Sequence, residues 1–133
     1  MAILVNENIK YWPLDLGISP KHNTYESIFI QAQQEKGPNL VIGVIYRPPG
    51  QSLPEFNDDL SILISILSKT KRNLILLRDF NIDLLKIATN GPTQTFMNIL
   101  TAEFIAPVIN CPTRITEFSA TLIDNIFTNL VQM

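Results

Sequence analysis

The sequence predicts an α/β or α+β layered sandwich, in which a mixed β-sheet is covered by helices. Three observations predict this class. Two strand-like runs, at residues 40–46 and 74–77, are apolar at consecutive positions rather than at alternate ones. Such runs are typical of strands whose two faces are both covered. Between them lies one amphipathic helical segment, which gives the strand–helix–strand order of layered folds.

The first helix has clear boundary signals. Short strands are expected before it, at residues 2–5 and 25–30, where apolar and β-branched residues gather. Ser52 and Glu55 form a capping box that starts the helix. Lys69 lies near its end, where a positive charge suits the helix dipole. The apolar residues that recur at helical spacing are Phe56, Leu60, Leu63, Ile64 and Leu67.

The second half of the chain is predicted to add one helix and one strand. A helix is expected at about residues 93–103, with Phe96, Ile99 and Leu100 turned inward. A last strand is expected at residues 122–130. The sequence contains no internal repeat and no linker, so residues 1–133 are interpreted as one domain.

Composition excludes several classes of protein. The 133 residues include 10 Lys and Arg against 12 Asp and Glu, and a net charge of −2 argues against nucleic-acid binding by bulk positive charge. One cysteine and one histidine exclude a disulfide framework and a multi-histidine metal site. No apolar run approaches the roughly 18 residues of a membrane-spanning helix. Without a basic leader, an intracellular protein is expected.

Two polar residues follow the apolar run at residues 74–77. Asp79 lies at the end of that strand, and Asn81 comes two residues later. Ligands commonly bind at the carboxyl ends of strands in α/β sheets. A carboxylate and a carboxamide there would suit a hard divalent cation and a phosphate oxygen. The alternative is a turn, because Asp and Asn both favour strand exits.

Two further segments have polar residues at strand positions. Tyr46 and Arg47 end the strand at residues 40–46, where a hydroxyl and a guanidinium would contact a phosphodiester. The alternative is an ordinary strand end stopped by prolines. Asp124 interrupts the last apolar strand, and a carboxylate in such a run needs a partner. The alternative there is an edge strand whose aspartate faces water.

Taken together, these segments resemble the endonuclease/exonuclease/phosphatase superfamily, and most closely the endonuclease domain encoded by non-LTR retrotransposons. The matching segments are Tyr46-Arg47-Pro48-Pro49, Asp79-Phe80-Asn81-Ile82-Asp83-Leu84-Leu85, Pro112-Thr113-Arg114-Ile115-Thr116 and Thr121-Leu122-Ile123-Asp124-Asn125-Ile126-Phe127-Thr128-Asn129. The resemblance implies a Mg²⁺-dependent endonuclease that hydrolyses phosphodiester bonds of DNA. A nuclear location is then expected if the chain derives from a retrotransposon protein.

The resemblance also implies a role for each motif residue. Asp79 would bind the metal and activate the attacking water. Asn81, Tyr46 and Arg47 would bind the scissile phosphate, and Tyr46 would stabilise charge that grows in the transition state. Asp124 would hold a histidine in its productive state. Phosphoryl transfer needs positioning and charge neutralisation rather than a nucleophilic side chain.

The chain departs from the family pattern at three places. The family's metal-binding glutamate belongs to strands that would precede this chain, and its Ser-Asp-His segment would follow Met133. Arg78 stands where the family has glycine before Asp-Phe-Asn. We therefore expect a partial domain with little or no activity and with weak or lost Mg²⁺ binding. Two alternatives stay open: a phosphatase acting on small phosphoesters, and a non-catalytic module that binds a protein partner at an exposed sheet edge.

Overall fold

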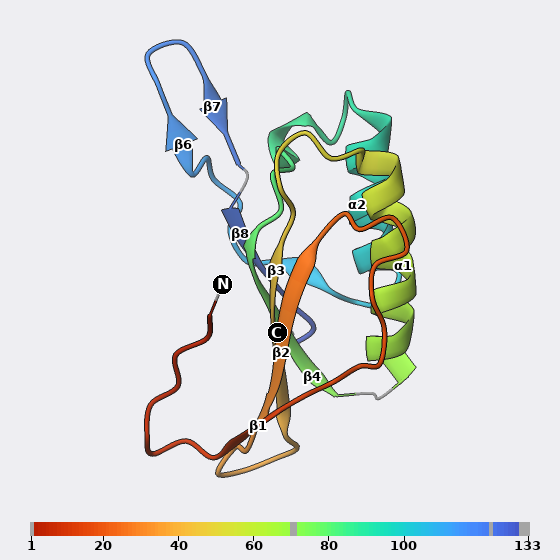
Figure 1. Ribbon diagram of the computed structural model, residues 1–133. Helices are drawn as coiled ribbons and strands as arrows, with labels where there is room; N and C mark the ends of the chain where they lie inside the picture. The colour runs from red at the N-terminus through yellow and green to blue at the C-terminus, as the bar shows by residue number, and fades with distance from the viewer. Residues whose placement is uncertain (1, 70–71, 123, 131–133) are drawn as a thin grey trace.

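The computed structural model describes residues 2–69, 72–122 and 124–130, and the side chains of Arg78, Asp79 and Asp124 lie outside the described part. Its main element is a six-stranded sheet in the order β1-β2-β3-β4-β8-β5 (Figure 1). Strands β3 and β4 run parallel, and the other neighbouring pairs of this sheet run antiparallel. The strands are β1 (Tyr11–Pro13), β2 (Glu26–Ala32), β3 (Leu40–Tyr46), β4 (Asn73–Asp79), β5 (Ala106–Pro107) and β8 (Asp124–Thr128). The predicted layered class with a mixed sheet is confirmed.

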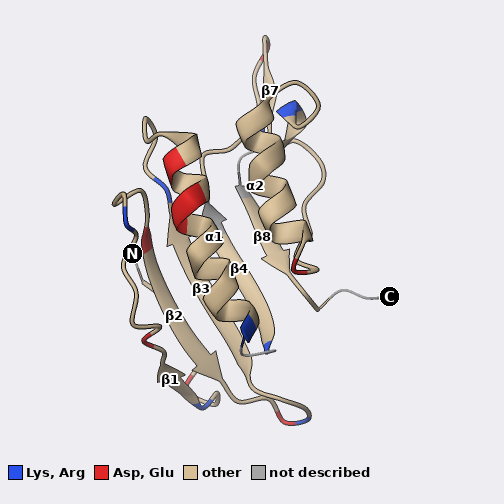
Figure 2. Cartoon of the chain, turned by 90° about the vertical axis from the view of Figure 1, so that its right-hand side faces the viewer, with Lys and Arg blue, Asp and Glu red and all other residues tan. Residues whose placement is uncertain are grey.

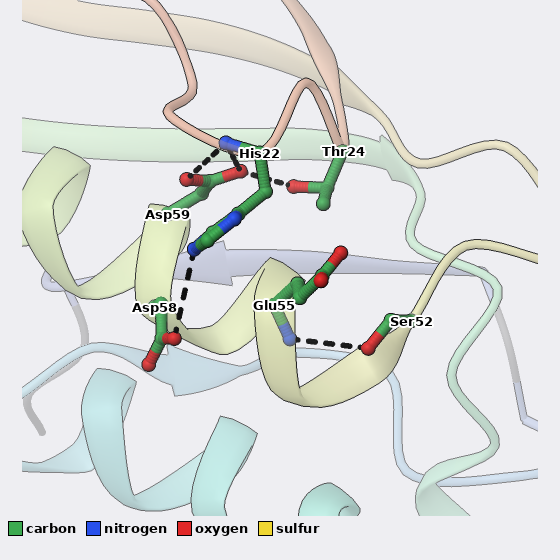
Figure 3. A network of polar contacts seen from close by, with 6 residues as sticks. All are labelled: His22, Thr24, Ser52, Glu55, Asp58 and Asp59. Atoms are coloured by element: carbon green, nitrogen blue, oxygen red, sulfur yellow. Dashed lines mark hydrogen bonds and ion pairs between the residues drawn. The ribbon is translucent and has the colours of Figure 1, made fainter.

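Helices α1 (Leu53–Lys69) and α2 (Gly91–Thr101) lie side by side on one face of this sheet (Figures 1 and 2). The Ser52 hydroxyl accepts the Glu55 N–H at 3.4 Å, as the capping box predicts (Figure 3). Helix α2 begins two residues before the expected position, because the Asn90 side chain caps it by accepting the Thr93 N–H at 3.0 Å.

The core lies between the helices and the sheet and is rich in aromatic rings. Phe96 of α2 has its centroid 5.7 Å from the rings of both Phe80 and Phe127 and 6.2 Å from that of Phe56. The predicted inward stripe of α1 is buried throughout, at 4% exposure or less. Aromatic rings at these separations contribute beyond their buried area. They join α1, α2, β8 and the residue after β4.

Gly43 leaves space for an aromatic ring on the helix side of the sheet. It lies opposite Phe29 in the sheet register. A Cβ atom built on Gly43 would lie within 2.9 Å of three atoms of the Phe29 ring. The missing side chain therefore provides the space that this ring fills.

The other face of the sheet carries a grid of aliphatic residues. One row pairs Ile28 with Val44, Val44 with Leu77, and Leu77 with Ile126 across four strands. A second row contains Ile30, Ile42 and Ile75. We call these seven residues the open face: Ile28, Ile30, Ile42, Val44, Ile75, Leu77 and Ile126. They do not belong to the core beneath the helices, and both described helices lie on the opposite side (Figure 1).

The loop before β2 is fastened to α1 by polar contacts (Figure 3). Asp59, at 2% exposure, accepts the His22 N–H at 3.1 Å and the Thr24 hydroxyl at 2.7 Å. The imidazole Nε2 of His22 lies 3.8 Å from a carboxylate oxygen of Asp58. Burial, with Asp59 nearby, raises the pKa of Tyr25 to about 12.

The strand predicted at residues 2–5 is wrong. These residues have no strand structure, and Leu4 is 96% exposed. The edge beside β2 is occupied instead by β1, so this stretch has no ladder to join. The sequence also gave no signal for the shortest strands, β1, β5, β6 (Arg114–Ile115) and β7 (Ala120–Thr121), which are two or three residues long. Neither described helix is long and apolar enough to cross a membrane.

Candidate active site at the strand ends

Three of the predicted site residues lie at the same level of the sheet, on neighbouring strands. Val44 and Leu77 are partners in the parallel pair, so Tyr46 and Asp79, each two residues further, end their strands together. Asp79 is in turn the direct partner of Asp124 in the antiparallel pair. The backbone therefore brings Tyr46, Asp79 and Asp124 into one row. The sheet register thus places these three residues side by side although they are far apart in sequence.

Asn81 follows this row in an unusual backbone conformation. Its φ of 52° lies in the left-handed region, which asparagine tolerates better than most residues. Its side-chain Nδ2 donates to the Arg47 carbonyl at 2.6 Å. The carboxamide is thus held against the exit of β3, one residue beyond Tyr46.

Arg47, in turn, donates hydrogen bonds from the end of β3 to the segment after β4. Its Nη1 donates to the carbonyls of Phe80 and Asn81 at 3.2 and 3.0 Å, and its Nη2 donates to the Gln51 carbonyl at 2.5 Å. Arg47 and Asn81 therefore bond each other's main chain, and the exits of β3 and β4 are joined. Such reciprocal bonds fix the spacing of the two strand ends.

The guanidinium of Arg47 is buried on the helix side of the sheet. The residue is 6% exposed, and its Cζ lies 5.5 Å from the centroid of the Phe56 ring. Burial lowers the pKa of Arg47. Three carbonyls and an aromatic face stabilise the charge. The predicted phosphate contact of Arg47 would require it to give up these bonds, so its geometry favours positioning of Asn81.

Phe80 attaches the main chain at the end of β4 to the aromatic core. It stands between Asp79 and Asn81, is 2% exposed, and has its ring centroid 5.2 Å from that of Phe127. The polar motif is thus interrupted by a side chain that belongs to the aromatic core. Its burial fixes the main chain on both sides.

Asp83 has a positioning role that the sequence motif alone did not reveal. Its side chain accepts the Leu122 N–H at 2.9 Å and the Leu85 N–H at 3.1 Å. It caps a short 3₁₀ turn, η1 (Leu84–Lys86), and ties the loop after β4 to the segment that enters β8. An aspartate directly before Leu84 and Leu85 is a capping signal that would have identified the first of these bonds.

Asn125 is a second polar residue that sequence reasoning missed. It is 5% exposed, and its side chain donates to the Ile109 carbonyl at 2.8 Å and accepts the Ile109 N–H at 3.0 Å. These bonds hold the segment after β5 beside β8. No local pattern predicts a partner 16 residues away.

A two-stranded hairpin, β6–β7, projects from the end of the sheet where β8 begins (Figure 1). Its strands pair Arg114 with Thr121 and Ile115 with Ala120. Phe118 in its turn is 91% exposed. The Thr116 hydroxyl accepts the Ser119 N–H at 3.0 Å and so stabilises the turn.

The carboxylates of the row are the residues to consider for a metal. Within the ranges that the structure describes, no group of three His, Cys, Asp or Glu side chains is arranged to hold one. Asp79 and Asp124 are strand partners by their backbones. The assignments made from the motifs to Asp79, Asn81, Asp124, Tyr46 and Arg47 remain predictions.

No protein-family model matches the sequence, and no curated protein matches it either. Solved structures that are similar to the chain include the following two. One is the endonuclease domain of TRAS1, a telomere-specific non-LTR retrotransposon, with a TM-score of 0.63 and 12% identity over 94% of this chain. The other is an endonuclease/exonuclease/phosphatase family protein from Leptotrichia buccalis C-1013-b, with a TM-score of 0.46 and 16% identity over 92% of this chain.

The chain spans 57% of the TRAS1 domain and 50% of the Leptotrichia protein. At these identities the similarity describes the fold and nothing finer. The fold is that of the TRAS1 nuclease domain, as the resemblance of the motifs predicted.

Proposed function

We propose that the strand-end row is the phosphate-binding part of a Mg²⁺-dependent phosphodiester hydrolase, a DNA endonuclease of retrotransposon type. We further propose that this chain alone has little activity. The observation that carries the proposal is the register, with Tyr46 and Asp79 ending adjacent parallel strands and Asp79 opposite Asp124. The nuclease fold supports it.

The row suits hydrolysis of a phosphodiester by water. Asp79 would orient the attacking water, and the Tyr46 hydroxyl would donate to a phosphate oxygen as negative charge develops there. Asn81 would hold the same phosphate by its carboxamide, positioned by its bond to the Arg47 carbonyl. These contributions are mainly positioning and electrostatic, which is what phosphoryl transfer requires.

The donor set is compatible with magnesium. Protein-bound Mg²⁺ is commonly held by one or two carboxylates, with water and substrate phosphate completing its shell. Asp79, with Asp124 as its strand partner, would provide such carboxylates. When bound, the ion would neutralise phosphate charge.

Weak activity is expected because Asp124 needs an imidazole to orient. The chain's one histidine is His22. Its N–H donates to Asp59 of α1, and its ring lies beside Asp58. Catalytic groups that act as a unit lose most of their effect when one is missing, commonly by several powers of ten in rate.

The β6–β7 hairpin favours nucleic acid over a small phosphoester as the substrate. A two-stranded β-ribbon is narrow enough to enter the major groove of DNA. This one carries Arg114 and an exposed Phe118 and projects at the end of the sheet where β8 begins (Figure 1). A small phosphoester bound at the strand ends would not reach a ribbon that projects from the sheet.

The test is nicking of supercoiled plasmid by the purified chain, with Mg²⁺ and with chelator. We expect slow, metal-dependent nicking that is lost in Asp79→Asn. Asp58→Asn is the matched control, because it removes an equally charged carboxylate that is 75% exposed on α1. Equal nicking by the wild type and Asp79→Asn would refute the proposal. Phosphate release from a soluble phosphoester, with plasmid untouched, would favour the phosphatase.

A second candidate function, a non-catalytic binding module, is favoured by the open face. The sequence analysis places the protein partner of such a module at an exposed sheet edge. The two edge strands are β1 and β5, which are three and two residues long and contain Pro13 and Pro107. Short edge strands with proline disfavour pairing with another strand. The binding surface of such a module is therefore better sought on the face of the sheet.

A further inference from the structure

We propose that Glu26 is a specificity-determining residue beside the strand-end row, and that its carboxylate makes the site favour a phosphodiester, with one negative charge, over a phosphomonoester, with two. The inference rests on the proposed function, because it takes Tyr46 as a phosphate ligand. It begins from the sheet register. Glu26, the first residue of β2, is the direct partner of Tyr46, the last residue of β3. The strand-end row therefore continues onto a fourth strand, with Glu26 at its β2 end.

Glu26 lies on the same face of the sheet as Tyr46. The next pair along these two strands joins Ser27 to Ile45, and Ile45 belongs to the core beneath the helices. Successive side chains of a strand alternate between the two faces of the sheet. Glu26 and Tyr46, each one residue from that pair, are therefore on the face opposite the helices. The register thus places a carboxylate beside the hydroxyl that is proposed to bind phosphate.

Glu26 is closer to Tyr46 than to the carboxylates proposed for the metal. Directly opposed residues of an antiparallel pair have Cα atoms about 4.5 to 5.5 Å apart. Asp79 lies one strand further along the row, so its Cα is about 10 Å from that of Glu26, at a strand spacing of about 4.8 Å. Asp79 instead has Asp124 as its direct partner. Glu26 is therefore placed to act on the phosphate at Tyr46 rather than on the metal.

The Glu26 side chain is exposed and has no described counter-charge. No ion pair joins it to another side chain in the part of the chain that the structure describes, where the ion pair is that of His22 with Asp58. A carboxylate and a phosphate that are a few ångströms apart repel each other even in water, and salt screens the repulsion. An anion bound at Tyr46 therefore meets an uncompensated negative charge on the β2 side.

This repulsion distinguishes phosphate esters by their charge. A diester carries one negative charge, whereas a monoester carries nearly two above its second pKa, which is about 6. The Coulomb energy is proportional to the charge of the ligand. If Glu26 weakens the binding of a diester by a given factor, it should weaken the binding of a monoester by about the square of that factor. Binding sites commonly gain specificity from such an unfavourable contact with the wrong ligand.

The experiment is an NMR titration at about pH 8, where the monoester is doubly charged, at low salt and one fixed Mg²⁺ concentration. The probes are thymidylyl-thymidine, a diester, and thymidine 5′-phosphate, a monoester. The signals are the backbone amides of Tyr46 and Asn81. Glu26→Gln removes the charge and should tighten binding of the diester by about 2- to 3-fold and of the monoester by about 4- to 9-fold.

Glu35→Gln is the matched control. It removes the same charge from an exposed glutamate that lies beyond the other end of β2, and it should change neither affinity. High salt should reduce the effect of Glu26→Gln on both ligands, because the screening length falls to about 3 Å at 1 M.

Three results would overturn the proposal: an equal change for the two ligands in Glu26→Gln, weaker binding in that variant, or the same change in Glu35→Gln. In these cases both ligands still bind at Tyr46 and Asn81, so the proposed phosphate site survives. If neither ligand shifts the two amides in any of the three proteins, the phosphate site itself is refuted, and this inference fails with it. The two failures are therefore distinguishable.

Discussion

The two faces of the central sheet have similar residues and different surroundings. On the covered face, Val41, Ile45 and Leu76 are at most 1% exposed beneath α1 and α2. On the open face, Ile42 and Leu77, their immediate neighbours in sequence, are half-buried. The comparison shows why strands that are apolar at consecutive positions are typical of sheets with a covering layer on both faces. The described helices α1 and α2 form such a layer on one face of the sheet and leave the open face without one.

The largest expected difference between the faces is in the free energy of unfolding. Phe96→Ala removes a ring that contacts three other aromatic residues and should destabilise the chain by about 3 to 5 kcal/mol. Leu77→Ala on the open face should cost about 1 kcal/mol, because Leu77 is only half-buried. Urea unfolding of both variants measures the difference. Equal losses would mean that the open face is as well packed as the covered one.

A smaller effect should appear at alkaline pH, through the buried hydroxyl of Tyr25. Its pKa is raised from 10.0 to about 12 in the folded chain, so its contribution is complete below pH 10 and is lost as the pH rises through 12. A shift of this size corresponds to at most about 2 to 3 kcal/mol. Tyr25→Phe should flatten the loss of stability over that pH range, measured by urea unfolding at each pH. Tyr11→Phe, at an exposed site, should leave the slope of the wild type, and an unchanged slope in Tyr25→Phe would contradict the assignment.

The smallest effect tests whether the buried contacts of Arg47 at the candidate site stabilise the fold, as the packing of the covered face does. Arg47→Lys keeps the charge, but an ammonium cannot reproduce the fork that reaches the Phe80, Asn81 and Gln51 carbonyls. We expect a loss of about 1 to 2 kcal/mol in the free energy of unfolding. Arg114→Lys, at an exposed hairpin position, should change it by less than about 0.5 kcal/mol. The same small change in both variants would mean that the Arg47 contacts at the strand ends contribute little to the free energy of unfolding.

Sequence patterns located the middle of the fold well. Strand β3 has the predicted bounds, α1 begins and ends as predicted, and β2, β4, α2 and β8 lie within a few residues of their expected positions. These elements carry long apolar patterns or caps, which are local signals. The strand at residues 2–5 failed, and β1 was missed, because the choice between two short segments for one sheet edge depends on distant partners.

The candidate site was predictable as a set of strand ends and not as a network. The sheet register places Tyr46, Asp79 and Asp124, which the motifs had singled out, at neighbouring strand ends, and their roles stay predictions. The bonds of Arg47 to carbonyls up to 34 residues away have no local signature. Nor do the bonds of Asp83 and Asn125 to segments that are distant in sequence. Networks of this kind depend on tertiary contacts, which single-sequence patterns do not contain.

The left-handed backbone of Asn81 has an evolutionary consequence. At a φ of 52° the position accepts few residues other than asparagine, aspartate and glycine. Exchange of Asn81 for glycine would keep the turn and remove the carboxamide that bonds to the Arg47 carbonyl. One replacement would therefore remove the proposed phosphate ligand and keep the turn. In a related chain that keeps the fold without the proposed phosphate binding, a change from asparagine to glycine is therefore expected at this position.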